Sequence, residues 1–323
     1  MDKTNHLSIF NDHLTTALFC QIIGGLRHHG FIRANHNHVM AVMGNGGGNG
    51  TALIELKARN QPHLHNSTGA VPLNQRNFGQ ICFAFHYHFA VADIHFAPTE
   101  GARQNLLAEG VPDSAIVVTG NTVIDALLKA ADIDYRFDDP ALQEAAKSDG
   151  GLILVTAHRR ESWGEPIRNI CRAVREIVHR YNDVRVVFSM HKNPIVREIV
   201  LPELAGVERV YLIEPPDYVP FVHLMKAAKI ILTDSGGVQE EAPSLGKPVL
   251  VLRETTERPE GVAAGCAKLV GVQTDKIISE TSKLLDDSAE YEKMARAVNP
   301  YGDGMAAKRI AKAIFDYFES RKQ

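Results

Sequence analysis

The chain has 323 residues, 45% hydrophobic and 23% charged, so it is long enough for two domains with their own cores. Its 35 Lys and Arg residues against 38 Asp and Glu give a net charge of −3, which lacks the basic footprint of a protein that binds nucleic acid or a membrane surface. The sequence contains no apolar run of membrane-spanning length, no signal-peptide pattern and no CxxC pair among its four cysteines. These features predict a soluble, cytoplasmic protein without a disulfide framework or a zinc site.

Residues 1–90 differ in composition from the rest of the chain. They hold only nine of the 73 charged residues, and eleven of the fifteen histidines lie at or before His95. Neither helical nor strand periodicity persists in this region. The glycine-rich run at 44–50 lacks the GK[ST] of a phosphate loop, which favours a flexible low-complexity loop. The histidines fit no recurring ligand spacing, so scattered polar histidines are the simpler interpretation and no metal site is predicted.

From about Asp93 onward, apolar segments alternate with amphipathic ones. Five short apolar segments are typical of buried parallel strands: 152–156, 184–188, 210–213, 230–233 and 249–252. Between the first two, apolar residues at helical spacing predict a helix with Pro166 in its first turn; these are Ile167, Ile170, Val174 and Ile177. The tail from Met305 to Phe318 carries Ile310, Ile314 and Phe318 at helical spacing. This alternation predicts a doubly wound α/β domain with ligands at the carboxyl ends of its strands.

The first polar cluster at a predicted strand end is Thr156–Ser162, which contains His158, Arg159 and Arg160. Arginine forks match phosphate oxygens and histidine can move protons, so the cluster suits an anionic ligand. The alternative is a solvated basic turn.

The second cluster places Ser235, Gly236 and Gly237 between a strand and a helix. Backbone N–H groups at such a helix start favour anions, which indicates a phosphate cradle. Glu240 and Glu241 fall within the first turns expected for this helix, where carboxylates favour the helix dipole. Their other candidate role is to accept hydrogen bonds from ribose hydroxyls.

The third cluster is the charged loop 253–260, directly after the last predicted strand. Such a loop can be solvated surface, but the same sheet edge also holds the other two clusters, which favours a shared site. The residues alone therefore predict a nucleotide- or phosphate-binding α/β domain and name no reaction.

Several long motifs resemble the non-hydrolysing UDP-N-acetylglucosamine 2-epimerases from about Asp93 to the C-terminus. They are the segment Val117–Leu127, VTAHRRESWGEP from Val155, HKNP from His191, TDSGGVQEEAPSLGKPVLVLRETTERPEGV from Thr233 and NPYGDG from Asn299. The resemblance implies a GT-B-like fold of two Rossmann-like domains with a UDP-sugar in the cleft between them. The implied division is an atypical or truncated first domain at 1–120, a UDP-binding domain at 121–303 and a helix at 304–323 that crosses back to the first domain.

The resemblance also implies an isomerase that interconverts UDP-N-acetylglucosamine and UDP-N-acetylmannosamine, with no redox cofactor or metal. In the family, UDP is eliminated to leave a 2-acetamidoglucal and is then added back with inversion at C2. Family members serve polysaccharide biosynthesis, and the resemblance further implies a homodimer.

Carried over by position, the family's functional residues fall on the three clusters. His158 would lie by the diphosphate or sugar as the catalytic candidate. Substrate binding would involve Phe221 at the uracil, Glu241 at the ribose, Arg258 at the diphosphate, and Ser235, Gly236 and Gly237 at phosphate. Arg159 and His191 match positions that line the site of a second, activating substrate molecule.

The sequence departs from the family before Asp93, where no GTRPE, GDTTT or HVEAGLR motif occurs. The family's catalytic carboxylates are therefore not identifiable, although a general base must lie within reach of its proton. We hypothesise that residues 1 to about 90 are an out-of-frame or rearranged stretch, and expect the first domain to be poorly packed. Two alternatives to an active epimerase are a non-catalytic UDP- or UDP-sugar-binding remnant and a GT-B glycosyltransferase that needs an acceptor.

Overall fold

The computed structural model describes residues 39–43, 52–56, 92–147 and 150–321. The chain divides into two compact units. The C-terminal unit comprises Thr122–Gly304, and the described part of the N-terminal unit comprises 39–43, 52–56, 92–121 and 305–321.

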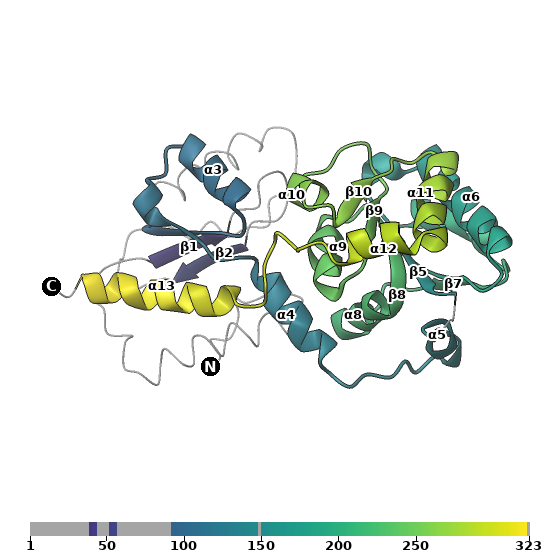
Figure 1. Ribbon diagram of the computed structural model, residues 1–323, viewed down its shortest axis with the longest axis horizontal. Helices are drawn as coiled ribbons and strands as arrows, with labels where there is room; N and C mark the ends of the chain where they lie inside the picture. Colours follow the sequence, from purple (N-terminus) through teal and green to yellow (C-terminus); the bar gives the residue numbers. More distant parts are fainter. Residues whose placement is uncertain (1–38, 44–51, 57–91, 148–149, 322–323) are drawn as a thin grey trace, which may run out of the picture. The chain divides into compact units, whose positions relative to one another are not determined.

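The C-terminal unit is built on a six-stranded, entirely parallel sheet with strand order β10-β9-β8-β5-β6-β7 (Figure 1). Its strands are β5 (Leu152–Ala157), β6 (Arg185–Met190), β7 (Val210–Ile213), β8 (Ala228–Thr233), β9 (Val249–Val251) and β10 (Ala267–Leu269). All five predicted strands form: β7 has the predicted ends, and the ends of the other four shift by at most two residues.

Helices connect these strands and cover both faces of the sheet. They are α4 (Thr122–Ala131), α5 (Pro140–Ala145), α6 (Glu165–Arg180), α7 (Pro194–Leu204), α8 (Tyr218–Ala227), α9 (Gly236–Glu241), α10 (Pro259–Ala263), α11 (Thr274–Asp286) and α12 (Ser288–Ala295), with short 3-10 turns at Arg160–Ser162 and Ala242–Leu245. Buried side chains of α6, α7 and α11 share one apolar cluster with alternate strand residues. Those of α4, α5 and α8 share another cluster with the intervening strand residues, so the sheet is the middle of three layers.

Two features of the sequence explain why these layers form. The central strands are predominantly apolar, and β5 is buried along its whole length, as expected where helices cover both faces. In α6, the predicted residues Ile167, Ile170, Val174 and Ile177 are all buried, and Pro166 occupies the first turn. The doubly wound α/β prediction is confirmed.

The N-terminal unit contains a four-stranded sheet with order β2-β1-β3-β4. Strands β1 (Val39–Met43) and β2 (Ala52–Leu56) are antiparallel, while β3 (Ile94–Ala97) is parallel to both β1 and β4 (Ile116–Val118). Helix α3 (Glu100–Ala108) and the 3-10 turn Asp113–Ala115 connect β3 to β4. The sequence pattern before residue 90 indicated no regular element, so β1 and β2 are a difference from expectation.

Helix α13 (Ala306–Ser320) returns to the N-terminal unit and packs on β3. Ile310 is buried with Ile94 and Phe96, and Arg309 donates to the Thr119 carbonyl at 3.1 Å. The apolar face continues through Ile314 to Tyr317 rather than to Phe318. The helix predicted for the tail is confirmed, and Phe318, which is also partly buried, lies outside this cluster.

The glycine-rich run at 44–50 and the histidines before residue 92 lie outside the described residues, as does most of the stretch hypothesised to be rearranged. Within the ranges given above, no helix combines the length and apolar character needed to cross a membrane.

Candidate functional site in the C-terminal unit

The three polar clusters meet because β9, β8 and β5 are neighbours in the parallel sheet, so their carboxyl ends share one edge. His158 and Arg159 follow β5, Asp234 and Ser235 follow β8, and Arg253 lies two residues beyond β9. The three clusters therefore lie at the same edge of the sheet, as the prediction of a shared site requires.

Asp234 joins the β8 end to the β5 end. Its side chain is 0% exposed, and Oδ2 accepts hydrogen bonds from the backbone N–H groups of His158 and Arg159, each at 2.8 Å. Oδ1 lies 3.1 Å from Nδ1 of the His158 ring. Burial favours the neutral acid, but the hydrogen bond and charge of His158, with the two N–H groups, hold the Asp234 pKa below its ordinary value. Asp234 is therefore an ionised anchor for this loop.

His158 stacks on His191, which follows β6. The ring centroids are 5.6 Å apart and the planes are inclined by 19°. The Nδ1 atom of His191 accepts a hydrogen bond from the backbone N–H of Asn193 at 3.1 Å. Sequence analysis separated these two histidines between the substrate and activator sites, whereas the structure brings their rings together.

Gly236, the first residue of α9, faces two guanidinium groups. A Cβ atom added to Gly236 would lie 3.5 Å from Nη2 of Arg258 and 3.6 Å from Nη2 of Arg159. Ser235 stands at the N-cap of α9, and Gly237 is exposed beside it. The guanidinium groups of Arg159 and Arg258 and the start of α9 therefore converge at Gly236. This arrangement stabilises an anion, and we call the space beside Gly236 the anion position.

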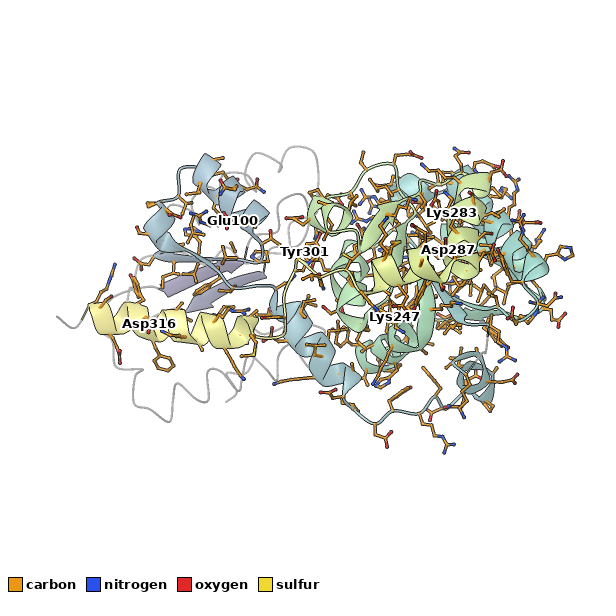
Figure 2. All side chains as sticks on the ribbon, in the orientation of Figure 1. Glu100, Lys247, Lys283, Asp287, Tyr301 and Asp316 are labelled. Atoms are coloured by element: carbon orange, nitrogen blue, oxygen red, sulfur yellow. The ribbon has the colours of Figure 1, made fainter. Side chains whose placement is uncertain are left out.

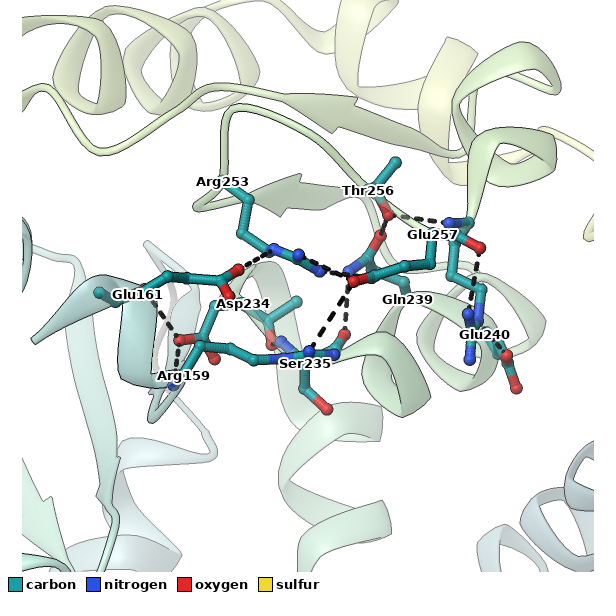
Figure 3. A network of polar contacts seen from close by, with 12 residues as sticks. Arg159, Glu161, Asp234, Ser235, Gln239, Glu240, Arg253, Thr256 and Glu257 are labelled. Atoms are coloured by element: carbon teal, nitrogen blue, oxygen red, sulfur yellow. Dashed lines mark hydrogen bonds and ion pairs between the residues drawn. The ribbon is translucent and has the colours of Figure 1, made fainter. Parts of the chain in front are cut away.

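A chain of alternating charges surrounds this position (Figure 3). Arg253 donates to both carboxylate oxygens of Glu257, at 2.5 and 2.9 Å, and its Nε lies 2.8 Å from Glu161. Arg159 lies 3.9 Å from Glu257. The hydrogen bonds from Arg253, helped by the charge of Arg159, lower the pKa of Glu257 to about 2. The network holds Arg159 in place between the ends of β5 and β9.

Glu240 and Glu241 do not lie in the first turn of α9, because the helix ends at Glu241 after six residues. The helix-dipole role considered for them is therefore wrong. Glu240 instead accepts a hydrogen bond from Nε of Arg258, and both side chains are buried. Glu241 accepts one from the Tyr218 hydroxyl at 2.8 Å, which ties α9 to the start of α8. Phe221 lies one turn further along α8 and is half-buried against the core.

The NPYGDG segment bonds both to helix α9, which carries Glu240, and to helix α10, which begins directly after Arg258. Asn299 donates to the Glu240 carbonyl at 2.8 Å and to the Ser244 hydroxyl at 2.6 Å. The buried Tyr301 (Figure 2) accepts a hydrogen bond from the backbone N–H of Gly261 in α10 at 3.1 Å. This motif is structural: it fixes both sides of the anion position.

Sequence reasoning placed most of these residues but missed Asp234, Glu240 as the Arg258 partner, and the pair Arg253 and Glu257. A charged residue directly after a buried strand was the available signal for Asp234 and Arg253. No three His, Cys, Asp or Glu side chains in the described residues are arranged to hold a metal ion.

Comparison with known proteins assigns the family. The sequence model of the family described as UDP-N-acetylglucosamine 2-epimerase matches residues 86–315, which include all three clusters. The chain belongs to the UDP-N-acetylglucosamine 2-epimerase family. The resemblance stated from the motifs is thereby confirmed.

Named members of this epimerase family are close in sequence. The UDP-N-acetylglucosamine 2-epimerases of Escherichia coli K12 and Salmonella typhimurium LT2 are each 52% identical, over 229 and 232 residues. Those matches cover 69% and 70% of this chain, and 61% and 62% of the two relatives. The chain thus spans about three fifths of the length of these curated relatives.

Solved epimerase structures share the fold. UDP-GlcNAc 2-epimerase from Neisseria meningitidis bound to UDP-GlcNAc has a TM-score of 0.64 and 46% identity, covering 71% of this chain and 63% of that one. The S. aureus MnaA–UDP structure has a TM-score of 0.70 and 34% identity, covering 98% of this chain and 83% of that one. These neighbours confirm the GT-B-like fold class.

Proposed function

We propose that the C-terminal unit binds the UDP moiety of a UDP-sugar at the carboxyl edge of its sheet. The observation that carries this proposal is the convergence of the Arg159 and Arg258 guanidinium groups on Gly236. A diphosphate carries two negative charges close together, and planar guanidinium forks match its oxygens. The named ligands of the Neisseria meningitidis and S. aureus relatives, UDP-GlcNAc and UDP, belong to this class.

The proposed roles follow from where each side chain lies. Arg258, Arg159 and the amides of 235–237 hold the diphosphate, with His158 beside them. Glu241, at the end of α9, accepts hydrogen bonds from the ribose, and Phe221 on α8 stacks on the uracil. His191 supports the His158 ring. An activator role for Arg159 and His191 stays a prediction, and their contacts with the anion position and with His158 support a part in primary binding as well.

The reaction we propose is the interconversion of UDP-N-acetylglucosamine and UDP-N-acetylmannosamine. Cleavage of the bond to the sugar leaves negative charge on the departing UDP, and the two arginines and the helix start stabilise that charge. No residue of the C-terminal unit is assigned the proton transfer at C2. A cytoplasmic location and a homodimer belong to the same proposal, the second being open to test by light scattering.

Binding without turnover is the second candidate function. Every side chain given a role above lies in the C-terminal unit, and no carboxylate matching the family's C2 acids is found before Asp93 in the sequence. A chain with a complete UDP site and no general base at C2 binds the nucleotide sugar and leaves it unchanged.

Two measurements on the full chain separate these candidates. Isothermal titration with UDP tests binding, and Arg258→Gln should weaken it at least tenfold, whereas the surface variant Arg168→Gln on α6 should not. Proton NMR with UDP-N-acetylglucosamine in D2O tests turnover: the manno epimer with deuterium at C2 establishes the epimerase. Binding without product supports the second candidate. No binding refutes the proposal, and UDP release only with an added acceptor would indicate a glycosyltransferase.

A further inference from the structure

The two oxygens of the Asp234 carboxylate have separate tasks. Oδ2 is saturated by the backbone N–H groups of His158 and Arg159, with the Ser162 hydroxyl at 3.4 Å. Oδ1 lies 3.1 Å from Nδ1 of the His158 ring, and in the part of the chain that the structure describes it accepts no hydrogen bond of good geometry from any group. The carboxylate is fully buried, so water does not replace a missing donor.

An ionised carboxylate only accepts hydrogen bonds, so the ring nitrogen that faces it must carry a proton. A neutral imidazole has one N–H, and placing it on Nδ1 leaves a lone pair on Nε2. We propose that Asp234 is a positioning residue that holds His158 as the Nδ1–H tautomer, so that Nε2 is the nitrogen offered to the ligand. The proposal rests on the proposed function only in that the ligand is a UDP-sugar.

The stacked partner ring carries its proton on the other nitrogen. Nδ1 of His191 accepts the Asn193 N–H, so neutral His191 holds its proton on Nε2. Two rings 5.6 Å apart therefore have opposite tautomers, each set by its own loop. His191 serves as an internal reference for His158.

Replacing Asp234 by asparagine makes a distinct prediction. The amide oxygen has to accept the two short backbone N–H bonds, because an NH₂ group there would face two donors. The NH₂ group then points at Nδ1 of His158 and makes that nitrogen an acceptor. His158 in Asp234→Asn should switch to the Nε2–H tautomer, while the His191 tautomer stays unchanged.

Long-range ¹H–¹⁵N correlation spectra of the full chain, recorded on the neutral imidazoles, report the tautomer directly. His158 and His191 are assigned from the signals lost in His158→Gln and His191→Gln. The expected result is a protonated Nδ1 for His158 in the native chain and a protonated Nε2 in Asp234→Asn. Asp286→Asn is the matched control, since it makes the same chemical change on α11, where Asp286 bonds Tyr181.

A native His158 with its proton on Nε2 overturns the proposal, as does an unchanged tautomer in a folded Asp234→Asn. The native spectrum decides the first point even if the variant does not fold. UDP titration supplies the functional readout: Asp234→Asn should bind at least tenfold more weakly, with Asp286→Asn unchanged. Correct tautomers in a chain that binds no UDP would refute the proposed function and leave the role of Asp234 in place.

Discussion

Arg258 and Glu240 form an ion pair in which the side chains are only 10% and 5% exposed. Glu240 accepts a hydrogen bond from Nε of Arg258, which leaves Nη2 of the same guanidinium group facing Gly236. Two buried charges that satisfy each other are tolerated, but either one alone is costly. The ion pair with Glu240 thus holds the Arg258 side chain at the anion position.

Glu240→Gln should destabilise the C-terminal unit by about 3 kcal/mol, because it leaves the Arg258 charge buried without its counter-ion. Urea unfolding measures this loss. The exposed pair Lys312–Asp316 on α13 is the control, and Asp316→Asn should leave the unfolding midpoint unchanged. Equal small effects for both variants would show that Arg258 does not depend on Glu240.

Gly236→Ala should separate binding from stability. Its Cβ would make ordinary contacts at 3.5 and 3.6 Å with the two guanidinium groups, so the fold accepts it. The methyl group occupies the space where we place the phosphate, so UDP affinity should fall at least tenfold, or about 1.4 kcal/mol. The thermal midpoint should stay or rise slightly, as alanine restricts the unfolded chain. Unimpaired UDP binding would show that the phosphate does not occupy the space beside Gly236.

The charge network predicts a specific acid sensitivity. The folded-state pKa of Glu257 is depressed to about 2 from an ordinary value of 4.5. Its stabilising contribution is therefore present above pH 4.5 and is lost as pH falls toward 2. Unfolding free energies measured between pH 6 and 2 should decline less steeply for Glu257→Gln than for the native chain. Parallel curves would contradict the Arg253–Glu257 geometry.

Tyr301→Phe should cost about 1–3 kcal/mol, because it leaves the buried Gly261 N–H without an acceptor. UDP affinity should fall as well, since α10 begins directly after Arg258. Tyr181→Phe removes a hydroxyl that bonds Asp286 near the surface and should cost less. Burial raises the pKa of Tyr301, so its ultraviolet titration should appear only on unfolding.

The sheet and its helices were predictable because the central strands are rich in apolar residues and α6 has apolar residues at helical spacing. Strand order explains why the clusters after residues 157, 233 and 251 meet, and the sequence already indicated that common edge. The partner of each charge was not predictable: Glu240 and Glu241 are adjacent in sequence, yet one bonds Arg258 and the other Tyr218. Pro243 signals the end of α9 nearby, but nothing in the local sequence indicates which partner each carboxylate takes.

The bonding partners of Asp234 were likewise not predictable from the sequence. The sequence showed that Asp234 follows a strand, but its Oδ2 accepts hydrogen bonds from residues 75 and 76 positions away. Such long-range pairing follows from β8 lying beside β5, which the order of strands along the chain does not specify.

Asn299 and Tyr301 are followed by Gly302 and Gly304, both of which have positive φ, and α13 begins two residues after Gly304. Asn299 bonds the end of α9 and Tyr301 bonds α10, so this one motif joins both elements to the segment from which α13 begins. If a ligand bound one conformation of that segment more tightly than another, any change that favoured this conformation would raise ligand affinity by the same factor.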